Sequence, residues 1–523
     1  LLEKLEGTLP DTLPEWVRSR HSFPLFEEAL TQLHFPTLPP GKSKSGLLAE
    51  LETGGTAVQQ RLAYEEFFDF QRGLQLLKEH RSKESKDRRL GITPGIRDII
   101  KSILPFHPTG AQKKVLKEIV DDLCGPRVMS RLLQGDVGSG KTIVAVQALI
   151  VVVENGFQTV LMAPTEILAE QHYETLTRYL EEVGYSIALL TARVKDKERK
   201  TILQGLAAGE IQIAIGTHAV FQKGVSFHRL GFVVIDEQHR FGVRQRSQIQ
   251  QKGEKPDTLV MTATPIPRSL ALTLYGDLDL SIIDELPPGR QPIRTVLRRD
   301  AERQKVYAGI RDEIRKGRQC YIVFPLVEES EKLELRAATE MARQLQQTVF
   351  AGLEVALIHG RLSGEEKAHT MARFNRGEID VLVSTTVIEV GIDVPNASLM
   401  VIEHANRFGL SQLHQLRGRI GRGEDKSYCV LLAEPGVSSE ARERLRIMQE
   451  TNDGFRIAEK DLELRGPGDF VGTKQSGIPQ FRFANLVRDR VWLERAQLDA
   501  QEIGNALFGL REHRNSQGTE AVL

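Results

Sequence analysis

The chain has 523 residues and carries no formal net charge, because 70 basic residues balance 70 acidic ones. This length predicts several domains, and the 40% hydrophobic and 27% charged content is typical of a soluble globular protein. The sequence has no apolar stretch long enough to cross a membrane, and a neutral chain excludes nucleic-acid binding through a uniformly basic surface.

The cysteines and the first residues of the chain indicate its compartment. Cys124, Cys320 and Cys429 lie far apart, with no C-x-x-C pair and no zinc-ligand spacing. This pattern predicts buried, reduced thiols. The chain starts without a charged and then apolar segment, so we expect no secretion signal and a cytoplasmic protein.

The first 95 residues are expected to form a linker region ahead of the main domains. Residues 1–55 are rich in Pro, Gly and Leu, and the prolines and glycine of residues 36–41 interrupt any long element. Residues 57–89 lack proline and carry a broad apolar face, which predicts one long helix. We interpret the mixed charges of residues 78–89 as a solvated helix surface or flexible linker rather than a DNA contact.

Residues 96–290 and 291–435 each alternate short apolar runs with amphipathic helical stretches, which is typical of βαβ units around a parallel sheet. The fold class is therefore α/β, with two tandem lobes joined near residues 287–289. Residues 436–523 are rich in Arg and expected to be helical, with a break at residues 466–468. Strands are expected at residues 131–133, 159–162, 211–215, 232–235, 258–261, 320–324, 354–358, 380–383, 398–402 and 428–432.

A phosphate-binding loop spans residues 135–142, Gly-Asp-Val-Gly-Ser-Gly-Lys-Thr, between an expected strand and an expected helix over residues 143–154. Its glycines, Gly135, Gly138 and Gly140, let backbone N–H groups close around phosphate oxygens, and the helix N-terminus adds positive potential. We expect Lys141 to reach the β- and γ-phosphates of ATP and Thr142 to ligate Mg²⁺. The loop alone would equally suit a kinase or a GTPase.

A pair of acidic residues reduces the number of enzyme classes that the phosphate loop allows. Asp236 and Glu237 follow directly on the apolar run of residues 232–235. A carboxylate at the end of a strand can hold Mg²⁺, and a second one beside it can orient or deprotonate the attacking water. Together with the loop, Asp236 and Glu237 predict ATP hydrolysis rather than phosphoryl transfer to a substrate.

The second lobe offers arginines for the same reaction. Residues 415–422, Gln-Leu-Arg-Gly-Arg-Ile-Gly-Arg, place Arg419 and Arg422 beside glycines that permit close approach to a ligand. Arginines supplied by a second domain can stabilise charge on the transferring phosphoryl group. This predicts ATP between two lobes that open and close with hydrolysis. For Arg417 the alternative of an exposed basic helix stays open.

These blocks, in this order, resemble the motifs of superfamily 2 helicases, which implies two RecA-like lobes. The resemblance assigns Gln112 to adenine and Gly391 and Asp393 to the nucleotide. It assigns Thr165, Thr217 and Thr385 to the nucleic-acid backbone. Residues 236–239 resemble the DExH box, and residues 262–264 resemble the element that couples nucleotide to DNA.

Longer stretches resemble the bacterial RecG family, and the resemblance covers residues 55–515. The stretches that carry this resemblance are residues 236–246, 262–268, 276–290, 325–330 and 410–419. Residues 453–477 resemble the helical translocation hairpin that RecG shares with the transcription-repair coupling factor, which implies DNA contacts by Arg456, Arg465 and Gln475. The family resemblance implies an ATP-dependent double-stranded DNA translocase or helicase on branched DNA, in stalled-fork reversal and Holliday-junction branch migration during recombination and repair.

The resemblance also implies partners and leaves alternatives. Branched DNA is the expected partner, with single-stranded DNA-binding protein as a further one, and we expect a monomer near the bacterial nucleoid. The alternatives are the motor of a transcription-repair coupling factor, an RNA helicase, and a DNA-binding scaffold that has lost catalysis. Gln238-His239 and residues 284–290 favour RecG over the coupling factor.

This sequence departs from the RecG pattern at two places. Thr191-Ala-Arg193 stands where the family tends to have a Gly-Ser pair that contacts the nucleic-acid backbone, and the hypothesis for Arg193 is a phosphate contact of altered geometry. RecG proteins also carry an N-terminal wedge domain with an OB-fold, and nothing before Ala57 reads as five strands of a barrel. We therefore expect this chain to lack the wedge.

Overall fold

The computed structural model describes residues 9–82, 85–104, 107–222, 224–237, 255–262, 267, 271, 276, 278–287, 290–325, 339–385, 394–423, 425–471 and 481–503. The chain divides into two compact units. The smaller unit comprises Leu1–Glu84, Pro267–Leu278 and Arg465–Leu523, and the larger unit comprises Ser85–Ile266 and Asp279–Leu464. None of the helices described here is both long and apolar enough to span a bilayer.

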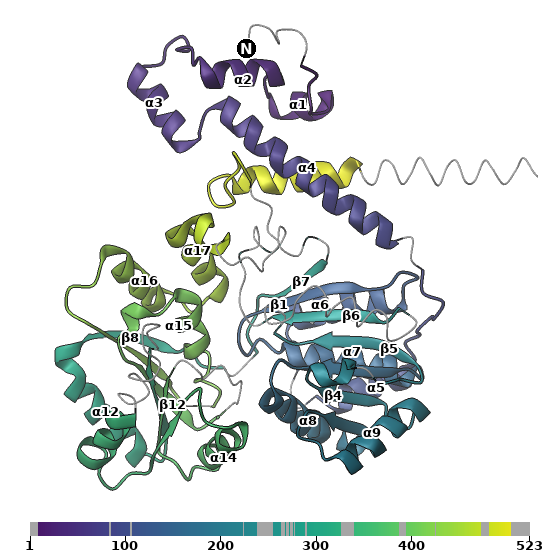
Figure 1. Cartoon of the computed structure of the whole chain (residues 1–523), viewed down its shortest axis with the longest axis vertical. Coiled ribbons are helices and arrows are strands. Elements are labelled where there is room, and N and C mark those ends of the chain that lie inside the picture. Colours follow the sequence, from purple (N-terminus) through teal and green to yellow (C-terminus); the bar gives the residue numbers. More distant parts are fainter. Residues whose placement is uncertain are drawn as a thin grey trace, which may run out of the picture. The chain divides into compact units, whose positions relative to one another are not determined.

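The first sheet of the larger unit has the strand order β3-β4-β2-β5-β6-β1-β7 among the described residues, and its pairings are parallel (Figure 1). Its strands are β1 (Ser130–Gly135), β2 (Gln158–Met162), β3 (Ile187–Leu190), β4 (Ile213–Gly216), β5 (Leu230–Ile235), β6 (Asp257–Thr262) and β7 (Asp279–Ile283). The accompanying helices are α5 (Pro94–Ser102), α6 (Gly110–Cys124), α7 (Lys141–Glu154), α8 (Glu166–Leu180) and α9 (Asp196–Ala208).

The second sheet of the larger unit is also parallel, in the order β10-β11-β9-β12-β13-β8 within the described ranges. Its strands are β8 (Arg294–Arg299), β9 (Gln319–Phe324), β10 (Val355–Ile358), β11 (Val381–Thr385), β12 (Ala397–Ile402) and β13 (Tyr428–Ala433). The helices that follow it in the chain or lie between its strands are α12 (Arg303–Arg315), α14 (Gly364–Asn375), α15 (Leu410–Arg417), α16 (Ser439–Glu450) and α17 (Gly454–Val471).

The two parallel sheets confirm the predicted α/β fold, and every predicted strand is present. Three strands were not predicted, namely β3, β7 and β8, and each of them lies at the edge of its sheet. An edge strand covers less of the core and can contain polar or charged residues, as β7 and β8 do, whereas β3 is apolar throughout. In β8, for example, Thr295, Val296 and Leu297 are flanked by arginines, which hides the strand pattern.

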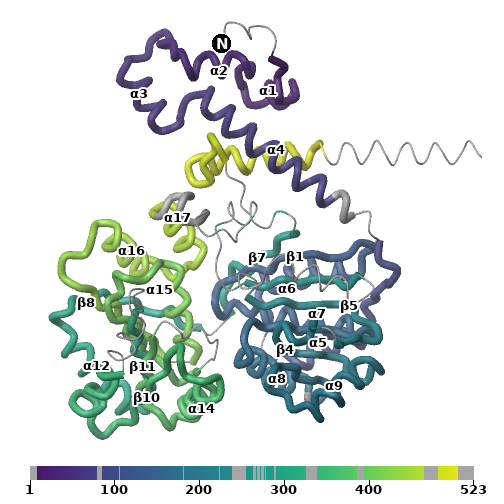
Figure 2. The backbone as a smooth tube through the Cα atoms, in the orientation of Figure 1, coloured from purple at the N-terminus to yellow at the C-terminus, as the bar shows by residue number. Residues whose placement is uncertain are grey.

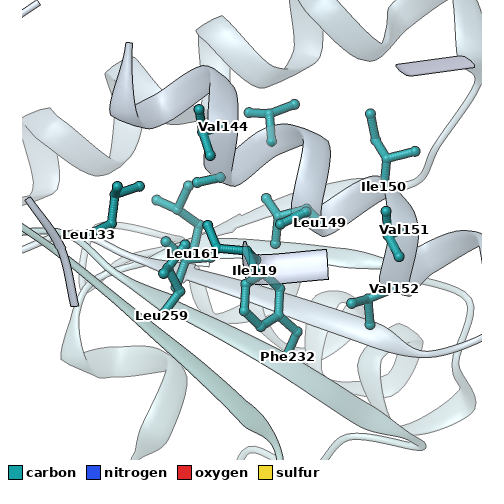
Figure 3. Packing of buried hydrophobic residues seen from close by; sticks show 14 of the residues in the cluster. Ile119, Leu133, Val144, Leu149, Ile150, Val151, Val152, Leu161, Phe232 and Leu259 are labelled. Atoms are coloured by element: carbon teal, nitrogen blue, oxygen red, sulfur yellow. The ribbon is translucent and has the colours of Figure 1, made fainter. Parts of the chain in front are cut away.

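Helix α7 anchors the first lobe. Residues 143–153 of this helix are all buried, and Figure 3 shows side chains of α7 against those of β1, β2, β5, β6 and α6. Val144 and Leu149 lie in the same cluster as Leu161 and Phe232. Each such side chain contributes about 1.5–3 kcal/mol when fully buried. A helix that is apolar all round is held firmly, and this fixes the position of the phosphate loop at its N-terminus.

The smaller unit brings together segments from the N-terminal and C-terminal parts of the chain. Its described helices are α1 (Glu15–His21), α2 (Phe26–His34), α3 (Lys44–Thr53), α4 (Ala57–Ser82) and a helix over residues 490–503. The 490–503 helix crosses α4 (Figure 2). There Asp499 accepts hydrogen bonds from Arg20 Nη1 at 2.6 Å and Tyr64 Oη at 2.5 Å. Glu66 of α4 accepts three backbone N–H groups from residues 482–484, so both chain ends stabilise α4.

The predicted long helix is correct in its start but wrong in its end. It ends at Ser82, and Ser85 instead forms an antiparallel bridge with Arg127. Lys86 is buried, donating to both carboxylate oxygens of Asp257 at 2.9 and 3.1 Å and to the carbonyls of Asp122 and Leu123. The prediction that these charged side chains are solvated is therefore wrong for Lys86. The buried carboxylate and the carbonyls at the end of α6, which have no partner within the helix, require a donor.

The predicted break at residues 466–468 is also wrong. Helix α17 continues through them to Val471. Pro467 removes one helical hydrogen bond and the two glycines weaken the helix, at a combined cost of several kcal/mol (about 3 for proline), but they do not end it.

Asp257→Asn is expected to destabilise the larger unit by about 3–5 kcal/mol, because it leaves the buried cations of Lys86 and Arg88 without a counter-charge. Urea unfolding followed by far-UV circular dichroism measures the change, because Trp16 and Trp492, the two tryptophans of the chain, both belong to the smaller unit. Asp98→Asn is the matched control, since Asp98 pairs with Lys101 in an exposed position and should have little effect. Equal midpoints for the two variants would contradict the structural role of Asp257.

Candidate functional site

The phosphate loop connects β1 to α7, as its sequence predicted. Gly138 and Gly140 have φ values of +76° and +89°, a left-handed conformation that only glycine adopts without strain. A side chain at Gly135 would place Cβ 2.5 Å from Ser139 Oγ. The loop therefore depends on these three glycines to keep its tight turn.

Lys141 is enclosed by this loop. Its Nζ donates to the carbonyls of Gly135 at 2.8 Å and Asp136 at 2.9 Å. Burial lowers the pKa of Lys141, and the nearby Glu237, Asp236 and Asp136 oppose that shift. The loop thus encloses a buried lysine side chain close to three carboxylates of the chain.

Two further features of the loop fit an anion. Ser139 Oγ is buried and has no hydrogen-bond partner among the described residues. The N-cap residue Gly140 supplies no side-chain acceptor, so the first N–H groups of α7 remain without a side-chain cap. Open N–H groups at a helix N-terminus, a cation and a buried hydroxyl suit a phosphate group.

The acidic pair lies at the carboxyl end of β5. The phosphate loop follows the carboxyl end of β1, at the same end of this parallel sheet. Asp236 Oδ2 lies 2.8 Å from His172 Nε2, and its Oδ1 accepts from the Glu237 N–H at 3.1 Å. Burial would raise the pKa of Asp236, but the hydrogen bond and charge of His172, with Lys141, hold it below its usual value. Asp236 is therefore an ionised carboxylate that can serve as a magnesium ligand.

Glu237 adopts a left-handed backbone conformation with φ of +52°. A non-glycine residue in this region costs about 1–3 kcal/mol and is commonly found at functional sites. This backbone geometry at the end of β5 agrees with the catalytic role predicted for Glu237.

Gln112 contacts the phosphate loop. Its amide nitrogen donates to the Ser139 carbonyl at 2.8 Å, and its amide oxygen accepts from Thr109 N–H at 3.0 Å in the capping box of α6. Each end of the amide thus makes one hydrogen bond within the first lobe. The adenine role stays a prediction.

The arginine-bearing segment of the second lobe approaches the phosphate loop. A Cβ at Gly418 would lie 2.8 Å from Val137 Cβ, which shows why glycine is needed there. Arg419 and Arg422 next to it are half-buried. Burial, with the charge of Arg290, lowers the pKa of Arg422 to about 10. Desolvated guanidinium groups beside the loop are suited to an anionic ligand.

Arg417 is not part of an exposed basic helix, so that alternative is wrong. Its side chain is buried and donates to the carbonyls of Met448 at 2.8 Å and Thr451 at 2.9 Å. It therefore fixes the connection between α16 and α17.

Three residues in or near the loop, Asp136, His414 and Arg290, were not predicted from the sequence as part of the site. Asp136 Oδ1 lies 2.6 Å from His414 Nε2, and Arg290 Nη1 donates to the Val137 carbonyl. Asp136 occupies a variable position of the loop motif, and His414 immediately precedes the predicted block 415–422. No local pattern could have paired them, because 278 positions separate the two in sequence.

The predicted nucleic-acid contacts lie at strand ends or on α17. Thr165 and Thr217 follow the neighbouring strands β2 and β4, and Thr385 ends β11 with a buried hydroxyl that lacks a partner within the described residues. Arg456 is exposed on α17. Arg193 instead pairs with Glu166 at 2.7 Å and with Glu170 at 3.4 Å, so its guanidinium is already engaged.

Some predicted sites lie outside the described residues. These are Gly391, Asp393 and Gln475, the Gln238-His239 part of the acidic box, and the side chain of Arg465.

Three family models match this chain. DEAD/DEAH box helicase matches residues 109–273, helicase conserved C-terminal domain matches residues 303–424, and ATP-dependent DNA helicase RecG, domain 3, C-terminal, matches residues 451–509. The matches follow the order of the two lobes and α17.

Relatives that match more than nine-tenths of this chain agree with these family models. The chain is 48% identical to the ATP-dependent DNA helicase RecG of Synechocystis sp., over 92% of this chain and 56% of that protein. It is 47% identical to the RecG of Bacillus subtilis, over 96% of this chain and 72% of that protein. A solved structure of RecG bound to a three-way DNA junction matches with a TM-score of 0.72 and 43% identity, covering 94% of this chain and 63% of that one. The chain thus spans little more than half the length of the Synechocystis relative, and it belongs to the RecG family of ATP-dependent DNA helicases.

Proposed function

We propose that this chain is an ATP-driven motor that moves along branched double-stranded DNA. The observation that carries the proposal is the approach of Gly418, with Arg419 and Arg422 beside it, to the phosphate loop at Val137. This arrangement supplies ligands for a nucleotide from both lobes. The RecG relative bound to a three-way junction supports the choice of branched DNA.

We propose these roles for the nucleotide site. Lys141 contacts the β- and γ-phosphates, and Thr142 and Asp236 hold Mg²⁺. Glu237 orients the attacking water, and the second-lobe arginines stabilise charge in the transition state. Bound ATP with Mg²⁺ supplies the phosphoanhydride whose hydrolysis drives movement. Further nucleotide contacts are proposed for Gln112, Gly391 and Asp393.

The proposed DNA contacts are directed at phosphates, because a motor must ignore sequence. They are Thr165, Thr217, Thr385, Arg456, Arg465 and Gln475. A chain without net charge needs such contacts to gather on a local surface.

ATP hydrolysis with matched nucleic acids tests this function. We expect strong stimulation by a synthetic three-way DNA junction and little by RNA of the same sequence. Stimulation by RNA alone would favour an RNA helicase, and no turnover with either would favour a silent scaffold. Displacement of stalled RNA polymerase by this chain would favour the motor of a transcription-repair coupling factor.

Arg456→Ala is expected to weaken duplex binding and to lower the slope of log affinity against log salt by about one, since one phosphate contact is lost. Fluorescence anisotropy at several salt concentrations measures the slope. Arg446→Ala on α16 is the matched control, because Arg446 is exposed but pairs with Glu443 and Glu450. Identical slopes for both variants would remove Arg456 from the proposed DNA surface.

Further parts of the proposal concern organisation and setting. We propose domains at residues 1–95, 96–290, 291–435 and 436–523, a monomeric state, and a cytoplasmic location. Single-stranded DNA-binding protein is proposed as a second partner. Size-exclusion chromatography with light scattering checks the monomer.

A further inference from the structure

One carboxylate of the phosphate loop bonds to three parts of the larger unit. Asp136 Oδ1 accepts from the Val137 N–H of its own loop at 2.6 Å and lies 2.6 Å from His414 Nε2 of α15. Its other oxygen, Oδ2, accepts from the N–H of Gly454, the first residue of α17, at 3.2 Å. Asp136 therefore contacts the loop, α15 and α17 at once.

The tautomer of His414 follows from its second partner. Arg417 Nη2 lies 3.1 Å from His414 Nδ1. Guanidinium groups only donate, so Nδ1 must accept and cannot carry a proton. The ring proton therefore lies on Nε2 and is donated to Asp136, which makes a directed, charge-assisted hydrogen bond.

Helix α15, which carries His414, is also hydrogen-bonded to α17 and to the segment just before it. Arg417 donates to the Thr451 carbonyl just before α17, and Ser411 at the other end of α15 donates to Asp461 within α17 at 2.8 Å. His414, Arg417 and Asp461 are at least 96% buried, whereas their partners Ser411 and Thr451 are half-buried, so these bonds are partly shielded from water.

A bound polyphosphate would disturb the partners of Asp136. Phosphate loops bind phosphate oxygens through backbone N–H groups, and one such N–H, that of Val137, is donated to Asp136 here. The carboxylate and a phosphate also repel each other at close range. Filling or emptying the loop must therefore change the balance of the bonds that Asp136 makes.

We propose that Asp136 is a positioning residue that couples occupancy of the phosphate loop to α15 and the start of α17 through its bonds to His414 and Gly454. The inference rests on the proposed function and deepens it, because α17 carries the proposed DNA contact Arg456. Asp136 acts through these bonds and not on the reacting phosphate.

Linkage between nucleotide and DNA measures this coupling at equilibrium. The affinity of the full chain for a synthetic three-way junction is measured with ADP and with a non-hydrolysable ATP analogue. We expect the two dissociation constants to differ about tenfold in the unaltered chain, which is typical of coupled sites. In Asp136→Asn and in His414→Ala the ratio should fall to about two or less, while the affinity of His414→Ala for ADP changes little.

Three further variants sharpen the test. His414→Gln keeps an N–H donor near Nε2 and should restore part of the ratio. The double variant Asp136→Asn, His414→Ala should lose no more than Asp136→Asn alone, because the bond that His414→Ala removes is one of the two bonds that Asp136→Asn alters. His369→Ala, an exposed histidine of α14, is the matched control and should keep the ratio of the unaltered chain.

The outcomes separate this inference from the proposed function. If the unaltered chain hydrolyses ATP with the junction but Asp136→Asn keeps its affinity ratio, the coupling role of Asp136 is wrong while the function stands. If the unaltered chain shows no junction-stimulated hydrolysis, the proposed function fails and the inference with it. Should His414→Ala not fold, the nearly isosteric Asp136→Asn carries the test alone.

Discussion

Lys141→Ala is expected to abolish ATP hydrolysis stimulated by branched DNA while leaving DNA binding intact. Lys141 is the buried ammonium of the phosphate loop, and alanine removes its charge and its bonds to the Gly135 and Asp136 carbonyls. Loss of one group that stabilises charge on the reacting phosphate lowers turnover by about 100–1000-fold. A coupled-enzyme ATPase assay with a three-way junction measures turnover, and anisotropy measures DNA binding.

Lys114→Ala is the matched control for this prediction. Lys114 is exposed on α6 in the same lobe, so its removal should change neither turnover nor DNA binding. Turnover retained by Lys141→Ala would show that residues 135–142 are not the hydrolytic loop.

Glu237→Gln is expected to reduce ATP hydrolysis by about 100–10,000-fold because the amide cannot accept a proton from water. Affinity for ATP should change little, since Lys141, Thr142 and Asp236 remain. Single-turnover hydrolysis and binding of a fluorescent ATP analogue separate the two effects. Glu198→Gln on α9 is exposed and serves as the control. A parallel loss of nucleotide affinity in Glu237→Gln would instead place Glu237 among the binding residues.

The centre of the fold could be predicted from sequence because it depends on local patterns. Strand β5 is buried at all six positions and ends at the acidic pair, and α7 is apolar over almost its whole length. Such runs report the strand or helix directly. The edge strands β7 and β8 could not be predicted in this way, since polar or charged residues interrupt their sequences, whereas β3 is apolar throughout and its omission has no such reason.

The site was predictable where a motif is continuous and not where distant residues meet. The loop of residues 135–142 and the pair Asp236-Glu237 are contiguous and could be identified. The buried ion pair of Lys86 with Asp257 and the hydrogen bond between Asp136 and His414 form only in the tertiary fold, between residues far apart in sequence. Charged residues in a mixed run look solvated until a buried partner is known.

For Gln112, too, the sequence motif did not predict the hydrogen-bond partners that the structure shows. Its position in the motif order predicted contact with adenine, whereas its observed bonds cap α6 and join the Ser139 carbonyl. A motif identifies the residue but does not fix its partners in each state of the site.

The central claim is movement along duplex DNA driven by ATP hydrolysis. Displacement of a third strand bound along a duplex arm of a synthetic three-way junction tests it most directly, since displacement that depends on ATP requires the motor to move along that arm. We expect displacement with ATP and Mg²⁺, and none with ADP, with a non-hydrolysable analogue, or from Lys141→Ala. Rapid ATP hydrolysis by the unaltered chain on that junction without displacement of the third strand would contradict the account.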